Sequence, residues 1–339
     1  MSQLSLFGSS DRPTNARAMA AKLQALAHRG VYFGTSSWKY EGWLGTIYTR
    51  DRYLSRGKFS QKKFEAECLA EYAETFPIVG GDFSFYQFPS PAYWKRLFGE
   101  TPESLLFGLK VPEDITVPKW PSHARYGSRA GTINRSFLDK NLLHELFTWP
   151  LEAYRHRVAV LMFEFGTFAK STFARPAEFL ARLDPFLEGL SRHFRYAVEI
   201  RNPEYLIPEY FETLRAHNTA HIFNAWTRMP ELGEQIAIPG AFTADFTVVR
   251  ALLRKGQTYE QAVQAYEPYE RTVDPNSAAR AALKAIAERA WKTGQPAYLF
   301  VNNRLEGNAP STIEAVVSSL ELEADETQPA FPPLSRRSP

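Results

Sequence analysis

The chain has 339 residues, a length that fits either two domains or one large α/β barrel with insertions. Its 40 Lys and Arg against 37 Asp and Glu leave a formal net charge of +3, too near neutral for charge alone to indicate nucleic-acid binding. The single cysteine, Cys68, excludes an internal disulfide and fits a reducing, cytoplasmic compartment, and no apolar run approaches the roughly 20 residues that cross a membrane.

A polar N-terminus precedes the first predicted helix. Residues 1–13 are Ser-rich with one compact apolar patch, and we expect them to form a flexible tail. The Ala-rich stretch 14–28 predicts a helix that ends before Gly30, because glycine readily adopts the conformation that terminates helices. Further along, Cys68 shares one helical face with Tyr72, which predicts a buried and unreactive thiol.

Eight short apolar runs punctuate the rest of the chain, and helix-like segments separate most of them. The runs span residues 32–38, 78–86, 105–111, 158–165, 196–202, 219–226, 242–251 and 297–303. This alternation predicts one α/β domain over 14–321, a single (β/α)8 TIM-type barrel with its chemistry at the carboxyl ends of the strands. The segment 322–339, rich in Pro, Ser and charged residues, is expected to be disordered.

Three connections are too long for simple turns. They follow the first, third and seventh predicted strands and span 39–58, 112–157 and 252–276. The second contains the basic and aromatic stretch KWPSHARYGSRAG (119–131), and loops of such length are usually lids or binding loops. If this loop reads nucleic acid, its aromatic side chains would stack on bases and its arginines would contact phosphates; the candidates are Trp120, Tyr126, Arg125 and Arg129.

Polar side chains end nearly every predicted strand. Alternate residues of a strand face opposite sides, so Glu199 and Arg201 share a face and should pair inside the barrel, while Lys110 shares the face of Gly108. Buried charges cost free energy unless they pair with one another or with a ligand. Three cations and three carboxylates at one mouth therefore predict a site for an anionic, polyhydroxylated or phosphorylated ligand.

The candidates for this site divide by role. The catalytic candidates are Glu199, Glu164, Asp82 and Lys110. The substrate-binding candidates are Arg201, Arg250, Asn302, Asn303, Glu306, Asn224, Ser36, Trp38 and Tyr86. For each of them a purely structural ion pair or hydrogen bond is the alternative. The loops after the seventh and eighth strands are the usual phosphate site of this fold, and Arg250 and the turn 303–307 lie there.

The sequence leaves open whether the strand-end carboxylates bind a metal ion. None of the seven histidines ends a strand on the carboxyl side, so the pattern does not indicate zinc. A magnesium ion held by Asp82, Glu164 or Glu199 is the alternative, because carboxylates are the ligands that magnesium prefers.

Five stretches are together similar to one known family. They are GTSSWKYEGWLGTIY (34–48), FGLKVPEDIT (107–116), AVEIRNPEY (197–205), FTVVR (246–250) and FVNNRLEGNAP (300–310). In the order and spacing of these stretches the chain resembles the YecE-like family (domain of unknown function 72) over residues 31–320. The resemblance implies a TIM-type barrel without an established activity and emphasises the family's polar positions, Lys110, Glu199, Arg201, Arg250, Asn302, Asn303 and Glu306.

The chain departs from the family pattern at the strand ends. Gly80 stands where the family has a glutamate, Asp82 where it has an asparagine, and Glu164 where it tends to have a glutamine. Val117 stands in place of a histidine. The loss of one carboxylate at position 80 and the gain of two, at 82 and 164, are consistent with a relocated acid–base group.

A second resemblance lies at the N-terminus. Gln3, Leu4, Leu6 and Phe7 stand in a pentapeptide, QLSLF, that resembles the motif by which bacterial polymerases and repair proteins dock on the replication sliding clamp. A glutamine for hydrogen bonding followed by leucine and phenylalanine for apolar pockets suits a short docking peptide. Coincidence, or packing of the tail on the barrel, is the alternative.

Three functions follow from these observations. The first is an enzyme of the hydrolase class, acting on a phosphate-bearing or nucleic-acid-derived substrate near the sliding clamp, with a carboxylate as general base. The second is a small-molecule sugar or sugar-phosphate hydrolase or isomerase without a link to DNA. The third is a non-catalytic module that binds nucleic acid through the 119–135 loop and recruits the clamp.

Overall fold

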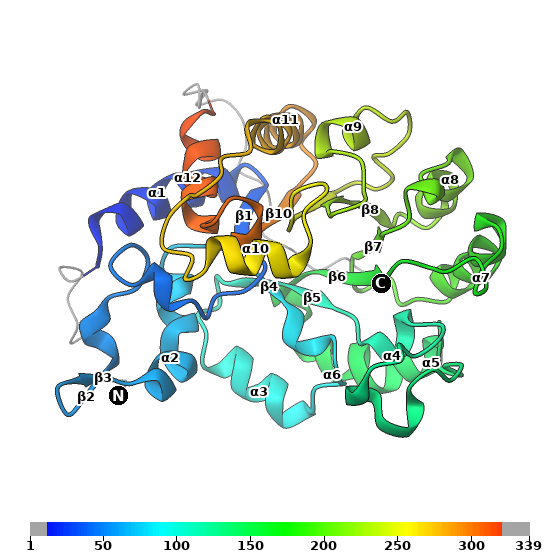
Figure 1. Cartoon of the computed structure of the whole chain (residues 1–339), viewed down its shortest axis with the longest axis horizontal. Helices are drawn as coiled ribbons and strands as arrows, with labels where there is room; N and C mark the ends of the chain where they lie inside the picture. Colours follow the sequence, from blue (N-terminus) through cyan, green and yellow to red (C-terminus); the bar gives the residue numbers. More distant parts are fainter. Residues whose placement is uncertain (1–11, 321–339) are drawn as a thin grey trace.

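Residues 12–320 are described by a computed structural model. The predictions for the pentapeptide QLSLF and for the tail 322–339 fall on residues outside this part. Within it, eight parallel strands close into a barrel surrounded by helices (Figure 1). The predicted fold class, a single TIM-type (β/α)8 barrel, is confirmed.

The barrel strands follow one another around the sheet in chain order, and β1 closes the ring by pairing with both β10 and β4. Their bounds are β1 (Val31–Thr35), β4 (Ile78–Gly81), β5 (Leu106–Lys110), β6 (Val158–Phe165), β7 (Tyr196–Ile200), β8 (Ala220–Ala225), β9 (Thr247–Ala251) and β10 (Ala297–Val301). A short antiparallel hairpin, β2 (Leu54–Ser55) and β3 (Lys58–Phe59), lies in the first long connection. Each predicted apolar run therefore contains one barrel strand.

Helices form the outer layer (Figure 1). The α-helices are α1 (Thr14–His28), α2 (Gln61–Ala73), α3 (Pro91–Gly99), α4 (Glu113–Thr116), α5 (Lys140–Leu143), α6 (Trp149–Leu151), α7 (Pro176–Glu188), α8 (Pro208–Ala216), α9 (Leu232–Ile236), α10 (Tyr259–Tyr266), α11 (Ser277–Thr293) and α12 (Ala309–Ser318). The 3-10 turns are η1 (Glu41–Trp43), η2 (Arg50–Tyr53), η3 (Asp82–Ser84), η4 (Ala124–Arg129), η6 (Glu152–Arg157), η7 (Pro203–Tyr205) and η8 (Asn303–Leu305), and η5 (His144–Thr148) is a π-helical turn.

Helix boundaries follow local chemistry. The Ser90 hydroxyl accepts a hydrogen bond from the backbone N–H of Tyr93 at 3.2 Å, and Pro91 occupies the first position of α3, where its missing N–H costs nothing. Gly30, which follows α1, has a positive φ of 78°. None of the helices within residues 12–320 combines the length and the apolar character that a bilayer crossing requires.

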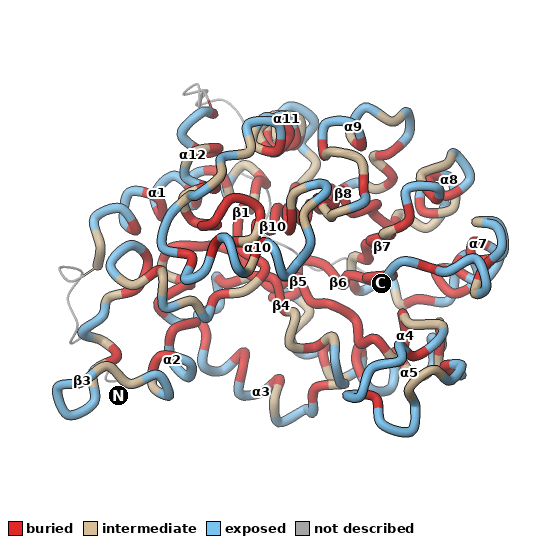
Figure 2. Tube along the Cα trace, in the orientation of Figure 1, coloured by how far each residue is buried: buried red, intermediate tan, exposed pale blue. Residues whose placement is uncertain are grey.

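The apolar core has two layers, one between the strands and the helices and one inside the barrel. Buried residues accordingly concentrate along the strands, while the outer surfaces of the helices are exposed (Figure 2). Cys68 is fully buried in the outer layer, which confirms the predicted burial of its thiol. Burial raises the pKa of this thiol to about 12, which disfavours the reactive thiolate.

Phe300 fills the centre of the barrel because nearby strands carry glycine where its ring lies. A Cβ added to Gly108 would lie 2.4 Å from Phe300 Cζ, and one added to Gly80 would lie 3.0 Å from Ser36 Cα and 3.4 Å from Phe300 Cδ1. Gly80 is the position at which the YecE-like pattern has a glutamate. With Phe300 in place, a side chain of that size has no room there.

The second predicted strand, 78–86, ends earlier than the apolar run. It stops at Gly81, and η3 (Asp82–Ser84) follows at once. The Ser84 hydroxyl donates to the carbonyl oxygens of Gly81 and Lys110, at 3.3 and 2.7 Å. These local side-chain bonds replace the ladder bonds that a longer strand would make.

The seventh predicted strand, 242–251, begins late, at Thr247. Before it, the hydroxyl of Thr243 donates to the carbonyl oxygen of Thr219 at 2.7 Å and accepts from the backbone N–H of His221 at 2.8 Å. A side chain thus satisfies backbone groups at the amino end of β8, where the apolar pattern alone predicted a strand.

The close approach of Phe300 to glycine gives a stability prediction. We expect Gly108→Ala to lower the free energy of unfolding by about 1–3 kcal/mol, because overpacking forces neighbouring atoms to shift. Gly166→Ala is the matched control, since a Cβ there meets no atom within 4 Å. Urea unfolding of both variants measures the difference; equal losses would contradict the packing described here.

Candidate functional site

The carboxyl end of every barrel strand presents a polar side chain toward the barrel axis. Two positions earlier the same face is apolar, and Met162, Ile222 and Phe300 there belong to the interior cluster. The polar positions are Ser36, Asp82, Lys110, Glu164, Glu199, Asn224, Arg250 and Asn302. Because parallel strands end at the same edge of a barrel, these residues form one polar layer on top of the apolar interior.

Arg250 on β9 joins carboxylates from three strand ends. Its Nη1 lies 2.5 Å from Glu164 Oε2 and also contacts Glu199 Oε2, and its Nη2 lies 3.4 Å from Asp82 Oδ1. Glu164 and Glu199 are directly opposite each other in the register of β6 and β7. Two carboxylates at that spacing repel each other, so cations between them are required if both are ionised.

Arg201 and Lys110 complete the set. Arg201 Nε lies 2.8 Å from Glu199 Oε1, as their shared strand face predicts, and its Nη2 lies 2.9 Å from Glu164 Oε2. Lys110 Nζ lies 2.7 Å from Glu164 Oε2 and 3.3 Å from Asp82 Oδ1. These residues, three cations and three carboxylates, are called the mouth network below: Asp82, Lys110, Glu164, Glu199, Arg201 and Arg250.

Electrostatics keeps Glu164 and Arg250 of the mouth network ionised. Burial alone raises the pKa of the Glu164 carboxyl, but the charges of Arg201, Lys110 and Arg250 outweigh burial and hold that pKa well below its ordinary value. Burial lowers the pKa of Arg250, and the carboxylates of Glu199 and Glu164 more than reverse the effect. Glu164 is therefore a fixed anion over the physiological range and a poor proton donor.

The predicted amide and serine ligands lie in the same layer but outside the mouth network. Asn224 Nδ2 donates to the carbonyl oxygen of Ile200 at 3.1 Å, and its Oδ1 is buried without a hydrogen-bond partner in the described part of the chain. Asn302 Nδ2 donates to the Ser36 hydroxyl at 2.6 Å, which links β10 to β1.

Two predicted ligands face the helices instead. Asn303 Oδ1 accepts from the backbone N–H of Ala309, at 2.8 Å, at the start of α12. Glu306 is fully buried; its Oε2 lies 2.8 Å from Arg280 Nη2 on α11 and accepts from the Thr312 hydroxyl on α12 at 2.6 Å. Both residues tie outer helices to the loop after β10, and the structure does not bring them to the mouth network.

Aromatic rings surround the mouth network. The Arg201 guanidinium lies 3.8 Å from the centre of the Trp226 ring, and Lys110 Nζ lies 4.5 Å from the centre of the Phe85 ring. Trp38 is nearly buried and packs edge-on against the Phe83 ring.

Tyr86, further out in the loop after β4, is well exposed, with 57% of its surface accessible. The Arg125 guanidinium lies 4.6 Å from the centre of its ring. This contact brings the 119–131 loop to the segment that follows Asp82.

The 119–131 loop is folded on itself. Trp120 and Tyr126 are buried with ring centres 5.4 Å apart, and the Arg129 guanidinium covers Trp120 at 4.2 Å. Arg129 also pairs with Asp114 at 3.2 Å. In this conformation the rings that were predicted to stack on bases are covered by the loop's own side chains.

Two residues near the mouth were not predicted from the sequence. Glu113 follows β5; burial raises the pKa of its carboxyl, and its Oε2 accepts from the Tyr126 hydroxyl at 2.8 Å. Arg304 follows β10, its guanidinium lies 4.4 Å from the centre of the Tyr259 ring, and no carboxylate of the described residues pairs with it. Both lie within the polar stretches that follow strand ends, VPED (111–114) and NNRLEG (302–307), which was the available signal.

Metal ligation by the three carboxylates stays a prediction. Over residues 12–320, no group of three or more His, Cys, Asp or Glu side chains is arranged to hold a metal ion. Nitrogen atoms of Arg250 and Lys110 lie between the carboxylates of Asp82, Glu164 and Glu199. A magnesium ion at this position would have to displace these cations.

The lowered pKa of Glu164 predicts acid sensitivity. Because the pKa is lower in the folded than in the unfolded chain, the stabilisation is complete above the ordinary carboxyl pKa of 4.5 and is lost as the pH falls from there toward the folded value. We expect the free energy of unfolding to decline below pH 4.5, and to decline less steeply in Glu164→Gln. Glu188→Gln, at an exposed position of α7, should keep the original slope. Identical slopes in both variants would contradict the assignment.

Comparisons with known proteins agree with this architecture. No protein with a curated description matches the chain. A crystal structure of a DUF72 family protein from Thermotoga maritima MSB8 is 20% identical, with a TM-score of 0.55 over 85% of this chain and 98% of that one. One from Enterococcus faecalis V583 is 14% identical, with a TM-score of 0.53 over 85% and 95%. Both share the fold. The model of a protein family of unknown function, DUF72, matches residues 32–336, so the predicted resemblance is confirmed and the chain belongs to the DUF72 family.

Proposed function

We propose that the barrel mouth is the active site of a hydrolase acting on a phosphate-bearing ligand with a ring that stacks on aromatic side chains. One observation carries the proposal. Asp82, a carboxylate with 43% of its side chain exposed, stands at the outer edge of a buried and balanced charge network. Barrels of this kind place their chemistry at this end of the strands.

Asp82 is the member of the mouth network that a ligand reaches first. Its partners Lys110 and Arg250 are buried, whereas its own side chain is nearly half exposed. A carboxylate held in place by two cations is suited to orient a water molecule and to take its proton. Glu164 and Glu199, which are buried and shared among cations, keep Lys110 and Arg250 in position for this role.

Arg304 supplies the uncommitted positive charge. It lies after β10, on the side of the barrel where phosphate groups usually bind, and no carboxylate of the described residues neutralises it. Tyr40 connects it electrostatically to the mouth: burial raises the pKa of Tyr40, the charge of Arg304 opposes the rise and that of Asp82 adds to it. A ligand with its phosphate on Arg304 would present its phosphorus to a water molecule held by Asp82, with the ester oxygen on the opposite side.

The proposed step is the hydrolysis of a phosphate ester. Asp82 removes a proton from water, the water oxygen bonds to phosphorus, and the ester P–O bond breaks. Arg304 and Arg201 stabilise the charge on the phosphoryl oxygens, and the leaving oxygen takes up a proton from solvent. Trp226 and Phe85 each hold a cation of the mouth network over one ring face, and the opposite face would receive the organic part of the ligand.

The two alternative functions are less well supported. A glycosidase needs one protonated carboxyl of its pair. Glu164 and Glu199 contact the same nitrogen of Arg250, and the cations around Glu164 lower its pKa, which opposes protonation. Reading of nucleic acid by the 119–135 loop would require Trp120 and Tyr126 to leave their buried positions.

We expect Asp82→Asn to abolish hydrolysis of the reactive phosphate esters in a panel of nucleotides, sugar phosphates and terminally phosphorylated oligonucleotides, while the melting temperature stays close to that of the parent. Arg304→Ala should raise KM for the same ester about tenfold or more, since charge-assisted hydrogen bonds contribute about 1.5–3 kcal/mol. Lys292→Ala, which removes one exposed charge at the end of α11, is the matched control. Hydrolysis at the parent rate in Asp82→Asn would contradict the proposal.

We further propose that the pentapeptide QLSLF connects the enzyme to DNA replication or repair by binding the sliding clamp. Residues 3–7 stand outside the described part, so the support is the sequence resemblance together with the chemistry of Gln3, Leu6 and Phe7. Such a contact would raise the local concentration of the enzyme at DNA and would not change its chemistry.

A pull-down of the full chain against the sliding clamp tests this link. We expect the parent to be retained and Leu6→Ala/Phe7→Ala to be lost, because the two side chains would fill apolar pockets worth about 1.5–3 kcal/mol each. Ser9→Ala/Ser10→Ala, in the same segment, should be retained like the parent. Equal retention of all three proteins would show that the pentapeptide is not the contact.

A further inference from the structure

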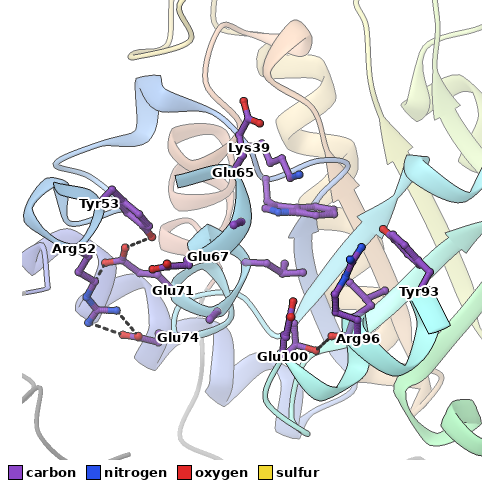
Figure 3. Close-up of a pocket in the computed structure, with 16 residues that line it drawn as sticks. Lys39, Arg52, Tyr53, Glu65, Glu67, Glu71, Glu74, Tyr93, Arg96 and Glu100 are labelled. Carbon is purple, nitrogen blue, oxygen red and sulfur yellow. Dashed lines mark hydrogen bonds and ion pairs between the residues drawn. The ribbon is translucent and has the colours of Figure 1, made fainter. Parts of the chain in front are cut away.

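A groove of about 770 Å³ runs between α2 and α3 on the outside of the barrel, and no member of the mouth network lines it. Figure 3 shows Arg52, Tyr53 and Glu74 on one side of it and Tyr93 and Glu100 on the other. Between these polar walls it is lined by apolar groups: Ala66, Leu69, Ala70, Leu97 and the ring of Trp38. The groove combines an apolar floor with hydrogen-bonding sides, which is how proteins hold extended peptide segments.

The described chain begins at the rim of this groove. Arg12 Nη2 donates to the carbonyl oxygen of Glu74 at 2.9 Å and to the Thr75 hydroxyl at 3.0 Å, and Arg12 Nε lies 3.1 Å from Glu74 Oε2. Glu74 itself lines the groove. The described part of the chain thus starts from a fixed anchor at the rim of the groove.

We propose that the segment preceding Arg12 docks in the α2–α3 groove in the free protein, with Leu4, Leu6 and Phe7 on the apolar floor. Eleven residues at roughly 3.3 Å each reach about 36 Å, and α2 with its 13 residues at 1.5 Å each is about 20 Å long, so the segment can follow the whole groove. The proposal does not depend on the activity of the barrel mouth.

The charges of the groove fit this occupant. Five glutamates line the groove against three cations, and neither Glu67 nor Glu100 has a cation within ion-pair distance among residues 12–320. Of the eleven residues that precede Arg12, only Asp11 carries a charged side chain, so the acidic walls do not repel residues 1–10. The free carboxylates can accept hydrogen bonds from the backbone N–H groups of an extended segment and from the Gln3 amide.

Docking in the groove and binding to the sliding clamp would compete, because both use the pentapeptide. The side chains that occupy the groove are the ones proposed to bind the sliding clamp, so a docked segment is unavailable to the clamp until it leaves the groove. Docking thereby lowers the apparent affinity for the clamp, by a factor set by the fraction of molecules in the docked state.

Disulfide trapping in the full chain tests the docking. Ser5→Cys is combined with Ala70→Cys, an exposed position that lines the groove, while the native Cys68 is buried and does not compete. We expect cross-linking under mild oxidation to be at least tenfold faster in this protein than after the further change Leu6→Ser/Phe7→Ser. Equal rates would mean that the tether alone brings the cysteines together, and would overturn the proposal.

A second pair of variants keeps the test independent of the segment. Ala66→Trp, at an exposed groove position, should block the groove and slow trapping about tenfold, whereas Ala281→Trp, on the exposed face of α11, should leave it unchanged. Ala66→Trp should also raise the affinity for the sliding clamp at least threefold. A protein that traps as expected but never binds the clamp would disprove the clamp link and leave the docking standing; a rate unaffected by Ala66→Trp would disprove the docking.

Discussion

The position of Arg250 between two facing carboxylates is the constraint on which the mouth of this barrel depends. Glu164 and Glu199 leave neighbouring strands in direct register and point the same way, so their charges oppose each other. Arg250 enters from β9 and contacts both. Removing it would leave two buried anions, at a cost of about 3–5 kcal/mol for breaking such a pair.

This arrangement separates the buried charges from the reactive one. Lys110 pairs with Glu164, and Arg201 pairs with both Glu164 and Glu199, so the buried part of the network holds three cations against two carboxylates and becomes neutral only with Asp82. Asp82 shares the same cations but stands where solvent reaches it. A fixed network beneath one accessible carboxylate is the kind of preorganised support that a catalytic base requires.

The sequence predicted the barrel because each strand is a short buried run that must be apolar, and eight such runs are visible by eye in the chain. Parity along a strand predicted the pairing of Glu199 with Arg201, because a β-strand leaves no choice of face. Loops offer no such rule. Glu306 and Asn303, predicted as ligands, turn outward to the helices. Arg304, which lies between them, was not predicted, although no carboxylate of the described residues pairs with it. Backbone turns of one or two residues decided these directions.

The most direct test of the account is a crystal structure of the full chain grown with a millimolar 5′-mononucleotide. The account predicts the phosphate within hydrogen-bond distance of Arg304, the base against Trp226 or Phe85, and Asp82 Oδ1 facing the phosphorus on the side opposite the ester oxygen. A nucleotide bound elsewhere on the molecule, with the mouth network unchanged and the mouth empty at saturating concentration, would contradict it.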